Sequence, residues 1–276
     1  MFYWLFKNQN IPNPSLVLWL NGGPGSSSMF GLFMENGPLR VERIGPGPGD
    51  LVIGLPKSGG SWSDEADILF LDQPVNTGFS YGDSFSTSMD MISQEMLTFL
   101  TSFIFEQYPE YATRDFLITG ESYAGKYLPQ LATTIHKYNL QQSSLPEGSQ
   151  KAIQLKAALI GDPFVSPVRQ RMATYLIAKD TGILDEVHLR QVAAMKRRCE
   201  NTISTMWNKT DNVCNDVLEY ISEMSGGVVT YDATIFNPDL DEAESPYGDY
   251  LSTKNPQSQA VYKALHIDAS TKNPIF

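Results

Sequence analysis

The chain has 276 residues, of which 42% are hydrophobic and 11% aromatic, and its formal net charge is −11 at pH 7. This apolar content is ample for a packed core and excludes a largely disordered protein. The acidic balance argues against nucleic-acid binding, because no basic cluster is present to neutralise phosphates. No apolar run in the sequence is long enough to span a bilayer.

Short apolar runs alternate with helical segments through residues 1–165. The runs predict buried strands at residues 2–6, 16–20, 68–71, 116–119 and 155–160. Helical spacing of apolar residues predicts helices over 88–108 and 125–138. This alternation predicts an α/β fold, in which a mostly parallel sheet has helices on both faces.

The character of the sequence changes after Gly161-Asp162-Pro163. Residues 166–225 are charged and helical, and helices are predicted over 172–179, 185–199 and 213–224. Residues 237–258 are acidic and rich in turn-forming residues, which predicts a mobile loop. We therefore expect two regions, a core of residues 1–165 and a second region of residues 166–276.

A serine lies between the predicted strand 116–119 and the predicted helix 125–138, in the segment Gly120-Glu121-Ser122-Tyr123-Ala124. A sharp strand-to-helix turn raises such a hydroxyl above the sheet, and small residues two positions away make room for the turn. The backbone N–H of Tyr123 can then donate to an oxyanion. Alone, these five residues would indicate only a turn, but between a strand and a helix they predict a nucleophile at Ser122.

A glycine-rich turn, Asn21-Gly22-Gly23-Pro24-Gly25, follows the predicted strand 16–20. Glycines let the backbone approach a ligand closely and direct its N–H groups inward. The α/β-hydrolases draw their second oxyanion donor from such a loop. A phosphate-binding loop is disfavoured, because neither G-K-[ST] nor G-x-G-x-x-G is present. The remaining alternative is a simple glycine turn.

Together with residues 72–81, DQPVNTGFSY, these two motifs resemble the serine carboxypeptidase family, which includes lysosomal protective-protein, vacuolar and vitellogenic-like carboxypeptidases. The resemblance covers essentially the whole chain, because residues 2–6, 34–38 and 264–266 are also similar to family segments. It implies an α/β-hydrolase fold with a helical cap inserted after residue 166. The implied reaction removes a residue from a peptide with a free C-terminus, and neither a cofactor nor a metal is implied.

The resemblance also assigns residues to roles. The catalytic group would be the nucleophile Ser122 with the N–H groups of Gly23 and Tyr123 as the oxyanion hole. The terminal carboxylate of the substrate would be bound by Asn21, Gly22, Glu35 and Glu121, with Trp19 close by. Two adjacent carboxyl groups share a proton because both cannot ionise cheaply, and the protonated one can donate to a carboxylate. Without the resemblance, the two glutamates would be taken for solvated surface acids.

A hydrolase serine needs an acid and a histidine base, which follow the nucleophile along the chain in this fold. His136 lies about four turns along the predicted helix after Ser122 and so points away from it. His188 lies in a charged helical stretch, and His266 resembles a non-catalytic position of the family. The sequence therefore carries the nucleophile part of a triad without a recognisable base.

Three explanations of the missing acid and base stand side by side. A second chain of a proteolytically matured enzyme supplies them, the sequence is an incomplete record of an active enzyme, or the protein is a catalytically inactive homologue used as a binding or structural module. The intact set of Ser122, Gly22, Gly23, Glu35 and Glu121 argues against decay. Acyl transfer to an alcohol instead of water would use the same nucleophile.

Cys199 and Cys214 are the two cysteines, and the sequon Asn208-Lys209-Thr210 lies between them. A disulfide closing this short loop would contribute on the order of 3 kcal/mol in an oxidising compartment. Two cysteines without neighbouring histidines do not make a zinc site. The sequon predicts a glycan on Asn208 and, with the acidic charge, a protein of the lysosome or vacuole or a secreted one. The chain departs from the resembled family at Ser26, usually Cys, and at Asp162, usually Asn.

Overall fold

The computed structural model describes residues 1–43, 51–56, 60–205, 210–229 and 232–236. These residues form two compact units that divide between Val165 and Ser166. The loop predicted over 237–258 and the histidine His266 lie outside the described residues.

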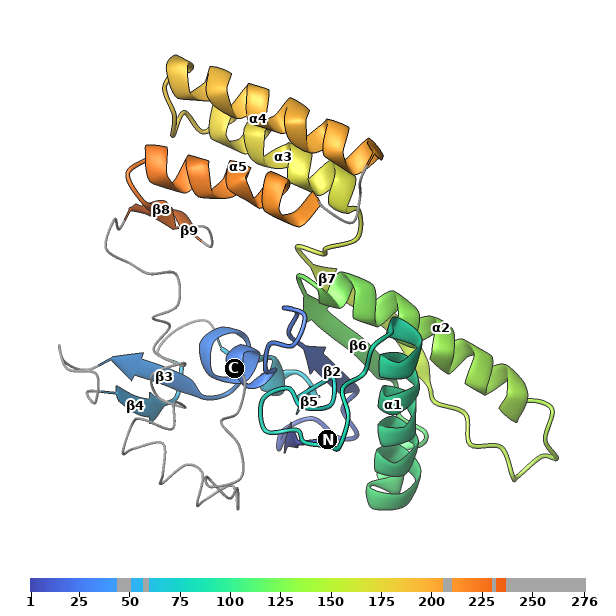
Figure 1. The fold of residues 1–276 in the computed structure, drawn as a ribbon. Coiled ribbons are helices and arrows are strands. Elements are labelled where there is room, and N and C mark those ends of the chain that lie inside the picture. Colours follow the sequence, from blue (N-terminus) through green and yellow to red (C-terminus); the bar gives the residue numbers. More distant parts are fainter. Residues whose placement is uncertain (44–50, 57–59, 206–209, 230–231, 237–276) are drawn as a thin grey trace. The chain divides into compact units, whose positions relative to one another are not determined.

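The first unit is built on a five-stranded sheet with the strand order β1-β5-β2-β6-β7 (Figure 1). The strands are β1 (Tyr3–Phe6), β2 (Leu16–Leu20), β5 (Asp67–Leu71), β6 (Phe116–Glu121) and β7 (Leu155–Gly161). The pairings β5–β2, β2–β6 and β6–β7 are parallel, and the edge strand β1 pairs antiparallel with β5. The predicted mostly parallel sheet is confirmed.

Alternate residues of the central strands face opposite sides of the sheet, as the two-residue period of a strand requires. In β2, Leu16, Leu18 and Leu20 belong to one buried cluster, while Val17 and Trp19 belong to a second cluster. Both faces of these strands are therefore buried, which explains why their sequences are continuous apolar runs.

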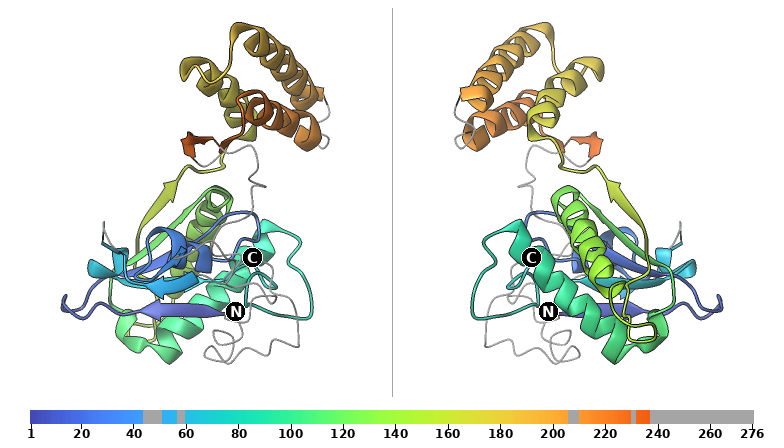
Figure 2. Two further views of the ribbon diagram at one scale, coloured as in Figure 1. Left: turned by 90° about the vertical axis from the view of Figure 1, so that its left-hand side faces the viewer. Right: turned by 90° about the vertical axis from the view of Figure 1, so that its right-hand side faces the viewer.

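Two long helices cover the first face of the sheet. They are α1 (Met89–Ser102) and α2 (Ala124–Gln142), which lie side by side in Figures 1 and 2. Ser88 caps α1 by accepting a hydrogen bond from the N–H of Met91 at 3.2 Å. The segment predicted as a helix over 88–108 is α-helical as far as Ser102 and continues as a π-helical turn, η3 (Phe103–Gln107), followed by the short 3-10 turn η4 (Pro109–Tyr111).

Shorter elements pack on the second face. They are the π-helical turn η1 (Gly31–Glu35), the strand β3 (Arg40–Arg43), which pairs antiparallel with β4 (Leu51–Gly54), and the 3-10 turn η2 (Trp62–Asp64). Leu32 and Phe33 of η1 pack with Trp19 of β2 in the second buried cluster. This packing brings the end of η1, and with it Glu35, to the carboxyl end of the parallel strands.

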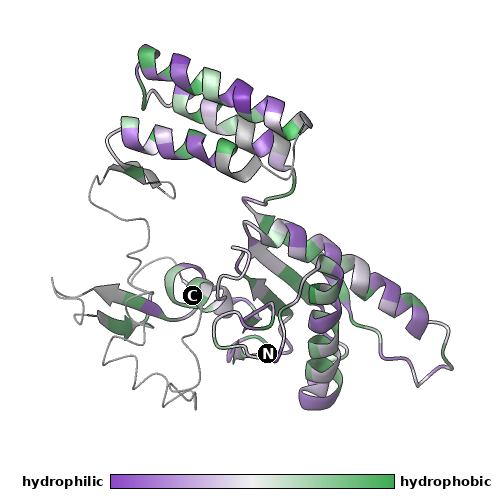
Figure 3. Cartoon of the chain, in the orientation of Figure 1, coloured by the Kyte–Doolittle hydropathy of each residue, from purple (hydrophilic) through white to green (hydrophobic). Residues whose placement is uncertain are grey.

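The second unit contains three helices, α3 (Pro167–Asp180), α4 (Glu186–Thr205) and α5 (Thr210–Met224), and a small antiparallel pair, β8 (Val228–Val229) and β9 (Asp232–Phe236). These helices correspond to the three helical segments expected after residue 166. Hydrophilic and hydrophobic positions alternate along them (Figure 3). Their buried side chains form a core of their own, made of Ala178, Leu184, Val192, Val217 and Ile221. Among the described residues, no helix has the length and apolar character needed to cross a membrane.

Candidate active site

Ser122 lies in the turn that joins β6 to α2, with a backbone φ of 53°. Its N–H donates to the carbonyl of Gly161 at 3.1 Å, and its own carbonyl accepts from the N–H of Phe164 at 2.7 Å and from that of Gly125 at 2.9 Å. The strained left-handed backbone is thus held from both sides by the end of β7 and the residues that follow it. This is the geometry of a nucleophile elbow.

The small residues of the motif are required by close packing. A Cβ atom added at Gly120 would overlap the carbonyl oxygen of Leu20 and come within 2.8 Å of the Cβ of Ala124. The methyl group of Ala124 is fully buried. A larger residue at either position would push β6 away from β2 or α2 away from the elbow.

The glycine-rich turn after β2 packs directly against this elbow. A Cβ atom added at Gly22 would overlap the backbone nitrogen of Tyr123 and lie 2.9 Å from the Cβ of Ser122. Gly23 has a φ of 97°, a region that favours glycine. The sequence-predicted donors, the N–H groups of Gly23 and Tyr123, therefore come from two segments that the structure brings together beside Ser122.

The side chain of Asn21 contacts the acidic residues next to Ser122. Its Oδ1 accepts hydrogen bonds from the Trp19 indole at 2.8 Å and from the N–H of Gly31 at 3.0 Å. These two donors fix the orientation of the amide, so its Nδ2 points to the carboxyl groups. That nitrogen donates to Glu121 at 3.1 Å and lies 3.4 Å from Glu35. The residues expected to form a carboxylate site thus occupy one network.

Burial and proximity perturb the two acids. Burial, followed by the charge of Glu121, raises the pKa of Glu35 to about 8. Burial also raises the pKa of Glu121. The carboxyl of Asp162 adds to the repulsion at both residues. Among the described residues no donor reaches Glu35 Oε2, although that atom is buried. A proton shared between the two carboxyl groups provides the hydrogen bond that this oxygen lacks.

Neighbouring residues support the acidic cluster. The guanidinium of Arg40 donates to the backbone carbonyls of Glu35, Gly37 and Leu39, which fixes the chain directly after η1. The indole ring of Trp19 packs edge-on against Trp62 with 5.3 Å between the ring centroids. These contacts hold the end of η1 and the indole in place.

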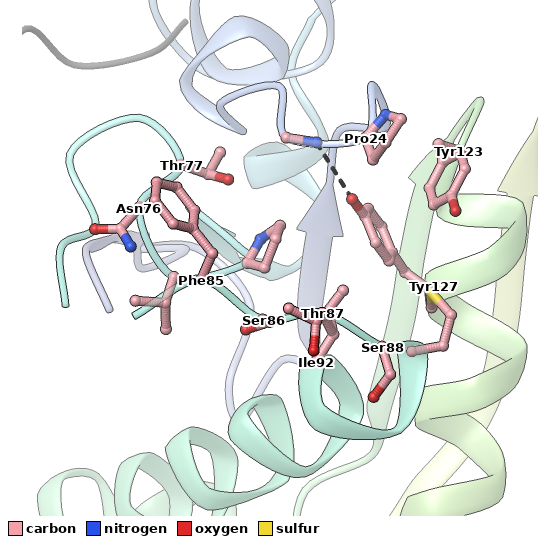
Figure 4. Close-up of a pocket in the computed structure, with 14 residues that line it drawn as sticks. Pro24, Asn76, Thr77, Phe85, Ser86, Thr87, Ser88, Ile92, Tyr123 and Tyr127 are labelled. Carbon is pink, nitrogen blue, oxygen red and sulfur yellow. Dashed lines mark hydrogen bonds between the residues drawn. The ribbon is translucent and has the colours of Figure 1, made fainter. Parts of the chain in front are cut away.

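A cavity of about 450 Å³ is lined in part by Pro24 and Gly25 of the glycine-rich turn (Figure 4). Tyr123 and Tyr127 of the elbow and α2 line it, and the hydroxyl of Tyr127 accepts a hydrogen bond from the N–H of Gly25 at 3.3 Å. The rest of the lining comes from the turn after β5 and the start of α1, including Pro74, Val75, Phe85, Met89 and Ile92. The cavity is mainly apolar.

The described histidines are not brought to Ser122. His136 lies twelve residues beyond the first residue of α2, about 18 Å along the helix, and is exposed. His188 belongs to the second unit, where its Nδ1 pairs with Asp185 at 2.8 Å. Within the described ranges, the Ser122 hydroxyl makes no hydrogen bond. Also among the described residues, no group of three or more acidic, histidine or cysteine residues could hold a metal ion.

Two of the expected site residues lie elsewhere. Cys199 of α4 and Cys214 of α5 are joined by a disulfide in the second unit. The sequon residue Asn208 lies outside the described residues, so its glycosylation stays a prediction.

Sequence reasoning assigned no role to three residues that the site uses. Asp72 and Tyr127 hold the glycine-rich turn through hydrogen bonds, and Asp162 acts on the glutamates through its charge. An acid placed directly after a buried strand and two residues before a proline was the available signal for Asp72. The part played by Tyr127 had no signal in the sequence, because an apolar helix face looks the same with or without a bonded hydroxyl.

Comparison with known proteins places this site in context. The family model "Serine carboxypeptidase" matches residues 1–273. The chain is 35% identical over 272 residues to "Carboxypeptidase Y homolog A" of Trichophyton rubrum, covering 96% of this chain and 46% of that protein. It is 41% identical over 187 residues to "Pheromone-processing carboxypeptidase KEX1" of Phaeosphaeria nodorum, covering 67% of this chain and 27% of the relative.

A solved structure is also similar. It is the crystal structure of KEX1(delta)P, a prohormone-processing carboxypeptidase from Saccharomyces cerevisiae, with a TM-score of 0.77 and 27% identity. The match covers 97% of this chain and 59% of that one. The chain spans about half the length of the relatives it matches most fully.

Proposed function

Because the chain belongs to the serine carboxypeptidase family, we propose that the protein is a serine-type carboxypeptidase, which hydrolyses the C-terminal peptide bond through an acyl-enzyme on Ser122. The observation that carries this proposal is the adjacency of two sites. Glu121, bound to the Asn21 amide, directly precedes Ser122, and Gly22 packs against the Cβ of Ser122. A group that binds a terminal carboxylate at Asn21 and the glutamates is therefore close to the nucleophile.

The acid pair provides the recognition of a free C-terminus. A carboxylate entering the site meets the amide of Asn21, the N–H of Gly22 and the carboxyl groups of Glu35 and Glu121. Two ionised glutamates would repel it, whereas a pair that retains a proton donates a hydrogen bond to it. The raised pKa of Glu35 supports this protonated form at neutral and acidic pH.

The reaction follows from the elbow and the oxyanion donors. Ser122 Oγ attacks the carbonyl carbon of the last peptide bond while its proton passes to a general base. The N–H groups of Gly23 and Tyr123 stabilise the oxyanion. The C–N bond then breaks, the leaving amine takes the proton, and water hydrolyses the serine ester to restore Ser122.

The general base and its acid come from outside the described residues, in the same polypeptide or in a second chain. The exposed position of His136 and the pairing of His188 with Asp185 support this assignment. We further propose that the protein is made in a secretory pathway and acts in a lysosome or vacuole or outside the cell. The disulfide between Cys199 and Cys214 and the sequon at Asn208 support this location.

The test compares two peptides of the same sequence, one with a free C-terminus and one amidated, incubated with the intact protein. We expect mass spectrometry to detect loss of a single residue from the free peptide and much slower cleavage of the amide. Ser122→Ala should abolish turnover and fluorophosphonate labelling without changing the thermal unfolding temperature appreciably. A native protein that neither cleaves the peptide nor reacts with the probe would instead be an inactive homologue, and conversion of the substrate mainly to an ester in added alcohol would indicate an acyltransferase.

A further inference from the structure

Asp72 is a fully buried acid that the proposed reaction does not use. It follows β5 directly and its side chain has no exposed surface. None of the ion pairs among the described residues includes it. Burial raises its pKa to about 6, although hydrogen bonds to its carboxyl oppose that change. A buried acid without a cationic partner is costly, so the hydrogen bonds that it accepts must offset this cost.

One oxygen of this carboxyl holds the glycine-rich turn. Asp72 Oδ1 accepts the hydroxyl of Ser27 at 2.6 Å and the N–H of Ser28 at 2.9 Å. The hydroxyl of Ser28 donates to the carbonyl of Leu71 at 2.6 Å and accepts the N–H of Asn21 at 3.2 Å. Asp72 and Leu71 therefore fix residues 27 and 28 at the end of the turn of residues 21–28. Ser28 in turn joins this end to Asn21 at its beginning.

The other oxygen holds the turn that follows β5. Asp72 Oδ2 accepts the N–H of Phe79 at 2.8 Å. A Cβ atom added at Gly78 would overlap this oxygen, and Gly78 has a φ of 51°. The backbone carbonyl of Asp72 also accepts the hydroxyl of Ser80 at 2.6 Å. Two turns that are distant in the sequence thus meet on one carboxylate.

We propose that Asp72 is a positioning residue for the oxyanion hole, because its carboxylate ties residues 21–28 to the end of β5 and so sets the place of the Gly23 N–H. This inference rests on the proposed function. A carboxylate suits the position because both of its oxygens accept hydrogen bonds. The Ser27 hydroxyl and the N–H groups of Ser28 and Phe79 all donate to it. An amide would turn an N–H group toward one of those donors.

The consequence is a loss of rate without a comparable loss of binding. Oxyanion donors act only when they are held close to the position of the developing charge, and a displacement of about 1 Å costs about 100-fold in rate. The Asn21 side chain is held independently by Trp19 and Gly31, so the carboxylate site should survive. We expect Asp72→Asn to lower kcat about 10- to 100-fold and to change KM by less than about threefold.

The matched control is Asp67→Asn. Asp67 is the first residue of the same strand, is also buried, and bonds to the hydroxyl of Tyr111 at 2.7 Å and to Arg114 at 3.0 Å. Both variants remove a buried carboxylate and should lower the unfolding temperature. The intact protein and each variant are compared by kcat, KM and the rate of fluorophosphonate labelling, normalised to the folded fraction.

The proposal requires labelling and kcat to fall in Asp72→Asn and to stay near the unaltered values in Asp67→Asn. Equal losses in both, or an unchanged kcat in Asp72→Asn, would overturn it. If Asp72→Asn does not fold, Ser27→Ala removes one donor to the carboxylate and should lower kcat severalfold with KM unchanged. An unaltered kcat in Ser27→Ala would then overturn the proposal.

Discussion

Glu35 and Glu121 share one partner, the side-chain amide nitrogen of Asn21, which lies 3.4 Å from Glu35 and donates to Glu121 at 3.1 Å. Such an arrangement is stable when the pair retains a proton, and the titration then belongs to the pair. The pair loses its last proton as the pH rises through the raised pKa of Glu35, about 8. Binding of a free C-terminus should therefore weaken with rising pH.

Replacing Glu35 with glutamine should remove this pH dependence. The introduced amide donates a hydrogen bond at every pH, so KM for a peptide with a free C-terminus should stay flat between about pH 6 and 9 in Glu35→Gln, within roughly threefold. In the unaltered protein KM should rise about tenfold for each pH unit above the pKa. Steady-state kinetics with free and amidated peptides measure the effect, and identical pH profiles for the two peptides would contradict it.

Removing the third carboxyl should move the same transition to lower pH. Asp162 raises the pKa of both glutamates by repulsion, so Asp162→Asn should make the pair easier to ionise. The pH at which KM begins to rise should fall, while kcat at low pH is retained. Asp115→Asn is the control, because that acid precedes β6 and lies about 20 Å along the strand from Glu121, beyond the screening length. If the pH at which KM begins to rise fell equally in both variants, the change would be due to net charge alone.

Removing the hydroxyl of Tyr127 should weaken the glycine-rich turn. Tyr127 is fully buried, and Tyr127→Phe leaves the N–H of Gly25 without its acceptor at 3.3 Å. We expect a loss of about 1 kcal/mol in the free energy of unfolding and a severalfold fall in kcat, up to about tenfold. Tyr138→Phe, farther along the same helix, should leave both unchanged. Denaturant unfolding and peptide kinetics measure the two effects, and a kcat that is unchanged in Tyr127→Phe would separate this hydroxyl from the reaction.

The disulfide of the second unit should stabilise that unit by an amount that grows with the logarithm of the length of the loop it closes. Cys199 and Cys214 are 15 residues apart, which corresponds to about 3 kcal/mol in the chain-entropy account. Cys199→Ser with Cys214→Ser should lower the unfolding temperature by several degrees. Non-reducing peptide mapping of native material should recover the two cysteines as one linked pair with a glycan on Asn208. Two free thiols and an unmodified Asn208 would remove the support for a secretory location.

The sheet and the elbow were predictable because their signals are local. Apolar runs gave the central strands, and Ser122 stood between a strand and a helix. The direction of β1 was not predictable, because a buried strand is equally apolar whether it pairs parallel or antiparallel. The pair β3 and β4 was missed because Arg40-Val41-Glu42-Arg43 is mostly polar and short.

The acidic cluster shows the limit of local signals more clearly. Glu35 and Glu121 are 86 positions apart, and only the family resemblance connected them before the structure was known. Their contact depends on the packing of η1 against β2, which no local pattern encodes. Asp72 was part of a recognised motif, yet its two hydrogen-bonded turns appear only when the chain is folded.

Glu121, Ser122 and Tyr123 are consecutive, so the recognition group, the nucleophile and the oxyanion donor of the proposed reaction share one stretch of backbone. Their spacing is therefore set by covalent geometry and is insensitive to small fluctuations of the fold. On the proposed function, this spacing allows one amino acid between the anchored chain end and the reacting bond. The shortened product again ends in a free carboxylate, so it is itself a substrate. Digestion would then advance stepwise, and its extent would depend on exposure time and on which residue next reaches the site.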